Sequence, residues 1–468
     1  NVLRSGLTQC RWALYRAIAV GICKMADFYE LQRAMRAMRQ SALQRGALAI
    51  LDLGSTKIGC LILRFDGLDP SLASDQVGSL AGQSSFRVVG SAITQSRGIE
   101  FGEISSMQEA ERAIRTVLQS AQKMANLRVD HLIACFSGGG SRSYGLNGSV
   151  KIENQIVQDE DIARVLSSCD LPDIGEGRQI LHAQPVNFAL DHRSGLVDPR
   201  GQIGNKLDVD LHMLTVRSKT IRDLAHCVKR CDLELAGVAS AAYVSGRSTL
   251  VEDEQELGAV CIDFGGGSTS YSIFLKKHMI FAGSIMLGGN HVTRDISLGL
   301  QVPISVAEKI KTKNGGLIAT GLDDRDLIEV GGETGDWEHD RRTVTRSELI
   351  GIMRPRLEEI LEDIRTQLEI AGFYELKSQK FVLTGGTCQT PGLDTLASRI
   401  LGQQVRIGRP LRIHRLPQAY SGSSCSALVG LALFAAHPQD EWWDFELPSA
   451  GYSSRTVRKA VRWLRENW

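Results

Sequence analysis

Two segments of the chain combine an aspartate, glycines and hydroxyl side chains directly after an apolar run. Residues 50–57 read ILDLGSTK and residues 261–269 read CIDFGGGST. Glycines let backbone N–H groups approach phosphate oxygens closely, and successive N–H groups form an anion nest. An aspartate can hold the hydration shell of Mg²⁺, which usually keeps several waters. We predict two phosphate-binding turns made of Asp52, Gly54, Ser55, Thr56, Lys57 and of Asp263, Gly265, Gly266, Gly267, Ser268, with Mg²⁺ held through water by Asp52 and Asp263.

Either turn alone is also typical of an ordinary tight β-hairpin. Two such turns about 210 residues apart favour a duplicated fold that clamps a nucleotide from both sides. Neither is a Walker A loop, because GxxxxGK[ST] is absent. A third strand ends in a glycine pair at residues 382–387, VLTGGT. Its simplest interpretation is a strand-to-helix turn, but together with the two predicted phosphate-binding turns it suits the binding of a nucleoside.

The elements around these turns alternate between strand and helix patterns. Residues 47–65 predict two strands joined by a turn, and residues 131–137 predict another. Amphipathic helices are predicted at residues 106–125 and 219–231, and helical patterns recur around 289–312 and 346–371. Strands alternating with helices indicate an α/β fold.

The composition is that of an ordinary globular protein, with 468 residues, 43% hydrophobic and 23% charged. No run approaches the roughly 18 apolar residues that a membrane-spanning helix needs. The ten cysteines include no CxxC pair, which disfavours a zinc ribbon. The net charge of +1 hides +6 in residues 1–46, +4 from Arg455 onward and therefore −9 between them.

The basic N-terminal segment (1–46) has two interpretations, a solvated arm or a helix that binds a partner or a membrane surface. Because the chain begins with Asn, we expect the native start at Met25. The C-terminal segment (453–468) predicts a basic amphipathic helix, which suits an anionic membrane surface. A helix docked on the protein body, or in another protein's groove, is the alternative. Its apolar and basic residues are Val457, Val461, Trp463, Leu464, Trp468 and Arg458, Lys459, Arg462, Arg465.

The order of these motifs resembles the actin/DnaK/sugar-kinase superfamily and, within it, the FtsA family of bacterial cell-division proteins. The resemblance covers about residues 47–435 plus the tail. Its most specific stretches are SRGIEFGEI, VKRCDLELAGVAS, EDEQELGAVCIDFGGGSTS, VLTGGTCQTPGL and QVRIGRP. It implies two actin-like lobes with ATP and Mg²⁺ in the cleft and a subdomain inserted in the first lobe.

The resemblance also implies roles for particular residues. Gly385, Gly386 and Thr387 match the adenosine turn, and Glu308 and Lys311 match positions that contact the nucleoside, although a solvated ion pair would look the same. Ser270 replaces an aspartate common in the superfamily, and residues 237–240 lack the carboxylate of the chaperones. Because phosphoryl transfer needs a group that orients the attacking oxygen, we expect ATP binding with slow or absent hydrolysis.

The resemblance predicts the following domain organisation along the chain: a basic extension (1–46), lobe 1 (47–96 and 207–255), an SHS2-type insert (97–206), the lobe 2 core (256–288 and 379–436), an outer subdomain that binds FtsZ (289–378), a linker (437–452) and a membrane-targeting helix (453–468).

Partners follow from the same resemblance. The stretch PRLEE makes Arg356 and Glu359 candidates for binding the C-terminal peptide of FtsZ, although a solvated helix face has the same composition. The implied protein is a peripheral adaptor at the division septum, on the cytoplasmic face of the inner membrane. It tethers FtsZ filaments, polymerises head to tail, contacts other division proteins through the insert, and binds no nucleic acid.

Two alternative functions are a small-molecule kinase or polyphosphatase of the superfamily and a pilus-assembly homologue of the PilM type. Both leave the C-terminal segment unexplained.

Overall fold

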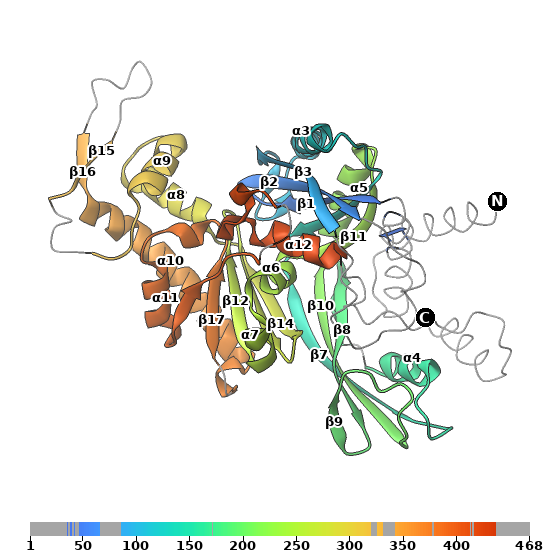
Figure 1. Ribbon diagram of the computed structural model, residues 1–468. Helices are drawn as coiled ribbons and strands as arrows, with labels where there is room; N and C mark the ends of the chain where they lie inside the picture. Colours follow the sequence, from blue (N-terminus) through green and yellow to red (C-terminus); the bar gives the residue numbers. More distant parts are fainter. Residues whose placement is uncertain are drawn as a thin grey trace. The chain divides into compact units, whose positions relative to one another are not determined.

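The computed structural model describes residues 46–65, 86–170, 172–319, 325–330, 342–376, 379–411, 413 and 416–436, with Met35, Met38, Arg39 and Ala42 (Figure 1). The predictions for the N-terminal segment fall largely outside these residues. Those for the linker and the C-terminal helix fall wholly outside them. Within the described part no helix is both long and apolar enough to cross a membrane.

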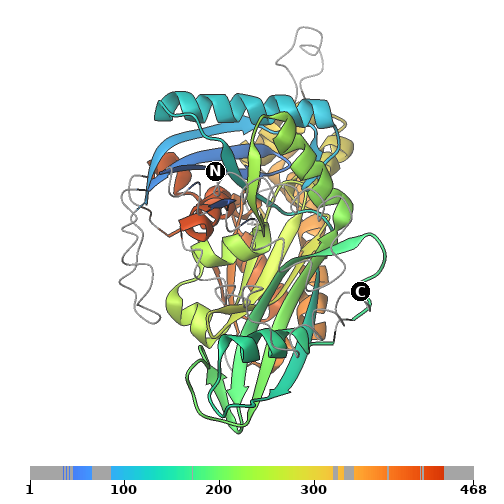
Figure 2. The same cartoon turned by 90° about the vertical axis from the view of Figure 1, so that its right-hand side faces the viewer.

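The first lobe is built on a five-stranded sheet in the order β11-β6-β1-β2-β3. β1 runs parallel to β6 and antiparallel to β2, so the predicted pair of strands at residues 47–65 is confirmed. Helix α3 lies across β2 and β3, where six small or branched residues of its apolar face are buried (Figure 2). The elements are β1 (Ala47–Leu53), β2 (Lys57–Phe65), β3 (Phe86–Gln95), β4 (Ile99–Glu100), β5 (Glu103–Ile104), α3 (Met107–Ala125), β6 (His131–Phe136), α5 (Ser218–Arg230) and β11 (Glu234–Ser240).

The second lobe repeats this sheet, in the order β18-β17-β12-β13-β14. β12 runs parallel to β17 and antiparallel to β13, as β1 does to β6 and β2. This repetition confirms the duplicated fold expected from the two turns. Helices α6 and α7 pack against this sheet, so residues 241–255 belong with the second lobe and not, as expected, with lobe 1. The core elements are α6 (Ala241–Thr249), α7 (Glu252–Leu257), β12 (Ala259–Phe264), β13 (Thr269–Leu275), β14 (His278–Ile285), β17 (Lys380–Thr384), η3 (Thr387–Gln389), α11 (Leu393–Leu401), β18 (Val405–Ile407), η4 (Gln418–Tyr420), η5 (Ser423–Cys425) and α12 (Ser426–Ala436).

A helical subdomain follows β14. The helical pattern expected around 289–312 is two helices, because Pro303 ends the connection and becomes the N-cap of the second. The long helix α10 buries eight apolar residues, and all but Ile350 belong to the hydrophobic core of the second lobe. The elements are α8 (Gly289–Gly299), α9 (Ile304–Asn314), β15 (Leu327–Val330), β16 (Arg342–Thr345), α10 (Arg346–Ile370) and η2 (Phe373–Glu375).

Two helices join the lobes. α12 packs against β1, β2 and β6 of the first lobe, α6 packs against β12 and β13 of the second, and the two helices pack against each other (Figure 1). A β-carbon added at Gly430 of α12 would lie 1.8 Å from the carbonyl oxygen of Val244 on α6. The helices therefore cross backbone to backbone, and only glycine fits at that point.

The insert has its own four-stranded sheet, in the order β7-β10-β8-β9. A separate compact unit comprises residues 145–172 and 184–211, while the bases of its strands belong to the larger unit. The expected limits of the insert, residues 97–206, differ from the structure at both ends. β6 lies between β1 and β11 in the first sheet, and β10, which ends at Arg217, belongs to the sheet of the insert. Residues 97–137 thus belong to lobe 1. The elements of the insert are β7 (Arg142–Lys151), α4 (Asp159–Ser167), β8 (Arg178–Leu190), β9 (Arg193–Leu196) and β10 (Lys206–Arg217).

Candidate nucleotide site

The two predicted phosphate turns have the same geometry. Leu53 pairs with Ile58 across the first turn, and Phe264 pairs with Thr269 across the second, so four residues form each turn. A β-carbon at Gly54 would lie 2.7 Å from the carbonyl oxygen of Lys57, and one at Gly265 would lie 2.7 Å from that of Ser268. The first glycine of each turn is therefore needed for its tight closure.

The turns meet each other across the two lobes. A β-carbon at Gly266 would lie 1.9 Å from Thr56 Oγ1, and one at Gly267 would lie 2.4 Å from Ser55 Oγ. Thr56 also lies 3.3 Å from Asn290 Oδ1, on the first turn of α8. Hydroxyls of one lobe thus face glycine backbone of the other, which is a donor set suited to phosphate oxygens.

Two carboxyl groups lie beneath the turns. Burial raises the pKa of Asp263 to about 6, against the opposing hydrogen bond from Ser245, and the charge of Asp52 raises it further. Burial also raises the pKa of Asp52, against a hydrogen bond from Cys135. Lys57 is the cation that lowers both values, and its Nζ donates to Ser424 Oγ at 3.0 Å. Two half-buried carboxyls with raised pKa values fit a hydrated divalent cation, whose positive charge would favour their ionised forms.

The described residues include no cluster of three or more His, Cys, Asp or Glu side chains that could hold a metal ion directly. The expectation that Asp52 and Asp263 hold Mg²⁺ through water stays a prediction. Asp263 is opposite Ser270 in the β12–β13 ladder, so the serine that replaces the superfamily's aspartate faces this site.

The glycine-pair turn at residues 385–387, predicted to bind adenosine, contacts the second predicted phosphate turn. Gly385 has φ +92°, a backbone conformation that favours glycine. A β-carbon there would also lie 2.4 Å from Asp263 Oδ1, so there is no space for a side chain. Thr387 donates its hydroxyl to the carbonyl oxygen of Gly265 at 3.0 Å. Gly386 lies between them, next to Ser424.

Glu308 and Lys311 form part of the same cluster. Lys311 Nζ contacts Glu308 Oε2 at 2.7 Å and donates to the carbonyl oxygen of Gly289 at 3.1 Å. Gly289 in turn donates its N–H to the carbonyl oxygen of Gly265 at 3.0 Å. The structure therefore brings all three glycine turns and the α9 ion pair together.

Sequence reasoning missed several residues at this site. Ser245, Cys135, Asn290 and Ser424 each contact a predicted residue. Asn290 follows the glycine pair of residues 288–289, a signal that could have found it, whereas the other three stand in no recognisable motif.

The partner-binding candidates lie on α10, outside this cluster. Arg356 makes a two-pronged ion pair with Asp295 of α8, through Nε at 2.8 Å and Nη2 at 3.1 Å. Its third nitrogen contacts Glu359 on the same helix. The two candidates are therefore adjacent, and the guanidinium is held by two carboxylates.

Comparisons with known proteins agree with this architecture. Residues 260–430 match the family model described as cell division protein FtsA, and residues 138–215 match the SHS2 domain inserted in FtsA. The second match supports the corrected start of the insert. A PilM-PilN type IV pilus biogenesis complex shares the fold, with a TM-score of 0.56 over 83% of this chain and 98% of that chain, at 13% identity.

Two bacterial relatives are similar over nearly their whole lengths. The cell division protein FtsA of Rhizobium meliloti (strain 1021) is 36% identical over 431 residues, which cover 90% of this chain and 95% of that protein. The FtsA of Pseudomonas aeruginosa is 28% identical over 92% of this chain and 100% of its own. Fold and site define an actin-like protein of two lobes with an SHS2 domain inserted in the first. The chain belongs to the FtsA family of cell division proteins.

Proposed function

We propose that the protein binds ATP with Mg²⁺ between the two phosphate turns. The observation that carries this is the convergence of the glycine turns after β1, β12 and β17 around the half-buried pair Asp52 and Asp263. Backbone N–H groups and the hydroxyls of Ser55, Thr56 and Ser268 would bind phosphate oxygens. Lys57 would neutralise part of their charge, and Glu308 and Lys311 would lie beside the nucleoside. Bound Mg²⁺ supplies charge neutralisation to the phosphates.

We propose that the protein hydrolyses ATP slowly or not at all. The expectation of slow or absent ATP hydrolysis rests on Ser270, which stands opposite Asp263 where the superfamily often has a carboxylate. Nucleotide would then act by favouring one lobe arrangement over another, through its different affinity for the two. A phosphate-release assay checks this, and turnover of order 1 per second would contradict it.

We propose further that the protein is an adaptor of the division ring, working on the cytoplasmic face of the inner membrane. Membership of the FtsA family supports a division role, and the charge pattern of residues 453–468 supports a membrane-binding tail. α10 would receive the C-terminal peptide of FtsZ near Arg356 and Glu359. The insert would serve self-association into polymers and contacts with other division proteins.

Two experiments test these parts separately. Calorimetric titration of ATP with Mg²⁺ into the full chain and into Lys57→Ala tests the nucleotide site. We expect at least a tenfold loss of affinity in the variant, and Lys219→Ala, an exposed lysine of α5, serves as control. Flotation with anionic liposomes, with and without residues 453–468, tests the tail. Undiminished flotation of the shortened chain would contradict the membrane role.

A further inference from the structure

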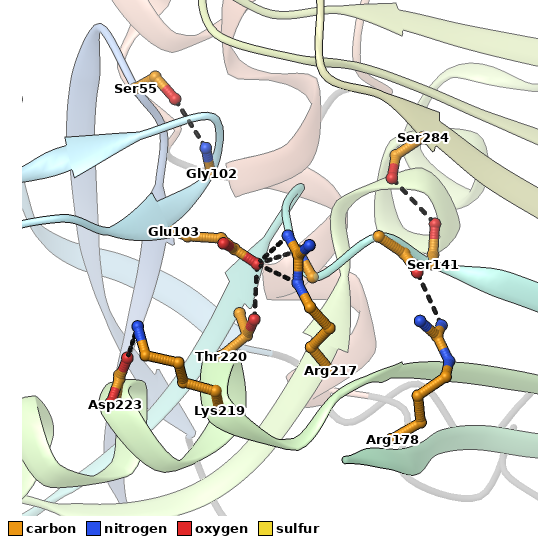
Figure 3. Close-up of polar contacts among 12 residues, drawn as sticks. Ser55, Gly102, Glu103, Ser141, Arg178, Arg217, Lys219, Thr220, Asp223 and Ser284 are labelled. Carbon is orange, nitrogen blue, oxygen red and sulfur yellow. Dashed lines mark hydrogen bonds and ion pairs between the residues drawn. The ribbon is translucent and has the colours of Figure 1, made fainter. Parts of the chain in front are cut away.

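The segment SRGIEFGEI (residues 96–104) is specific to the family resemblance, but the site described above gives it no role. The structure places it against the first phosphate turn. The N–H of Gly102 donates to Ser55 Oγ at 2.9 Å (Figure 3). Phe101 and Gly102 both have positive φ, at 52° and 72°. Because a left-handed phenylalanine is unfavourable, the surrounding contacts must hold this turn in place.

The next residue, Glu103, gathers four hydrogen bonds on one carboxylate oxygen (Figure 3). The donors are the N–H of Gly139 at 2.9 Å, Arg217 Nη2 at 2.7 Å and Nε at 3.2 Å, and the hydroxyl of Thr220 at 2.7 Å. Burial raises the pKa of Glu103, but the bonds from Thr220 and Arg217 outweigh burial, so the pKa lies below its ordinary value of 4.5. The carboxylate is therefore charged at neutral pH.

The donors of Glu103 stand at both ends of the insert. Gly139 precedes β7, the strand that enters the insert, and Arg217 ends β10, the strand that leaves it. Gly139 and Gly140 have φ of +87° and +54°, and a β-carbon at Gly138 would lie 2.6 Å from the carbonyl oxygen of Gly102. One side chain thus fastens the entry and the exit of the insert to the segment that touches Ser55.

The second phosphate turn makes its own contact with the entry. Ser137 Oγ lies 2.7 Å from Ser268 Oγ. Just beyond it, Ser141 Oγ lies 3.1 Å from Ser284 Oγ on β14 of the second lobe (Figure 3). Each phosphate turn is therefore hydrogen-bonded to a residue at the base of the insert. Ser55 of the first turn contacts Gly102, and Ser268 of the second contacts Ser137.

We propose that residues 101–103 and 137–140 form a joint that couples nucleotide binding to the freedom of the inserted domain. The inference rests on the proposed nucleotide site. Phosphate oxygens would form hydrogen bonds with the hydroxyls of Ser55 and Ser268, which also bond Gly102 and Ser137. Binding therefore changes the joint's contacts, and Glu103 transmits the change to Gly139 and Arg217. By linkage, a partner that binds the insert changes nucleotide affinity by the same factor.

Backbone amide hydrogen exchange of the full chain, with and without ATP and Mg²⁺, tests the joint. In the wild type, nucleotide should slow exchange in peptides covering residues 50–57 and 261–269, and also in those covering 137–144 and 212–220. Glu103→Gln keeps the shape but removes the charge. We expect it to retain protection at the turns and to lose about fivefold or more of the nucleotide-dependent protection at 137–144 and 212–220.

Glu111→Gln is the matched control. Glu111 also bridges two arginines of the first lobe, Arg115 at 3.1 Å and Arg230 at 2.6 Å, and should leave the pattern of the wild type unchanged. Ser137→Ala, which breaks only the contact with Ser268, should reduce protection at 137–144 even if Glu103→Gln does not fold.

The outcomes separate the two proposals. Protection of the turns without protection of 137–144 and 212–220 in the wild type overturns the joint and leaves the nucleotide site standing. Equal nucleotide-dependent protection of residues 137–144 and 212–220 in wild type, Glu103→Gln and Ser137→Ala also overturns the joint and leaves the nucleotide site standing. Failure of nucleotide to protect the turns at all overturns the nucleotide site, and the joint with it.

Discussion

Thr56 and Gly266 touch across the two lobes, so closely that a β-carbon on Gly266 would lie 1.9 Å from Thr56 Oγ1. They belong to strand turns that are about 210 residues apart in the chain. Direct contact of the turns leaves no room for a phosphate group between these two residues. Under the proposed function, nucleotide binding would separate Thr56 from Gly266 and part the lobes at this point.

Gly266→Ala forces that separation in the absence of nucleotide. We expect the variant to lose about 1–3 kcal/mol of unfolding free energy, the usual cost of an added methyl group in a packed site. Thr56→Ala combined with Gly266→Ala should recover part of this loss, because the clashing oxygen is then absent. Urea denaturation measures both.

Gly351→Ala is the control for that experiment. Gly351 lies in α10 with no atom within 4 Å of an added β-carbon, so alanine should stabilise the protein by roughly 0.5–1 kcal/mol. Equal effects of alanine at Gly266 and at Gly351 would contradict the contact between the turns.

Asp263→Asn should stabilise the protein that is free of nucleotide and Mg²⁺. The pKa of Asp263 is about 6 in the folded state against an ordinary 3.8, so ionisation costs stability. The cost begins as pH rises above 3.8 and is complete above about 6. In EDTA at pH 8 the variant should be more stable than wild type by about 2–3 kcal/mol, with the difference vanishing near pH 4.

Under the proposed function, the same substitution should weaken binding of ATP with Mg²⁺, since it removes one of the two carboxylates proposed to hold the hydrated cation. Asp394→Asn, at an exposed position of α11, should change neither property. A variant whose stability follows the wild-type pH profile would show that burial of Asp263 carries no such cost.

Gly430→Ala tests the crossing of α6 and α12. Its β-carbon would lie 1.8 Å from the backbone oxygen of Val244, an atom that cannot rotate away. We expect a loss of about 1–3 kcal/mol or more in unfolding free energy, because both helices must shift. Thermal unfolding would reveal it, and a melting temperature equal to that of wild type would argue against backbone contact at the crossing.

Arg356→Ala should lower affinity for the C-terminal peptide of FtsZ by tenfold or more, if α10 receives that peptide. Arg365→Ala removes another arginine of the same helix, which is more exposed than Arg356 and pairs with Glu369, and should leave affinity unchanged. Fluorescence anisotropy of a labelled peptide measures both. Because Asp295 holds Arg356, Asp295→Asn should also alter peptide affinity without unfolding α10.

The strands, the main helices and the three glycine turns could be predicted because each rests on local pattern. Apolar runs of five to seven residues indicate buried strands, and Asp-x-Gly after such a run indicates a tight turn, whatever the rest of the chain does. The family resemblance then gave the correct duplicated fold. It gave the wrong start for the insert, because no local feature of residues 97–137 shows that β6 joins the first sheet.

By itself, then, the sequence determined which residues form the turns, the order of the two similar lobes and the basic character of the chain's ends. Tertiary structure alone decided which of those residues meet. Lys57 reaches Ser424 across 367 residues, and Glu103 reaches Gly139 across 36 and Arg217 across 114. Such pairs depend on how whole sheets and helices pack. The spacing of apolar residues along a helix or strand indicates which face is buried, but it does not indicate which distant element packs against that face.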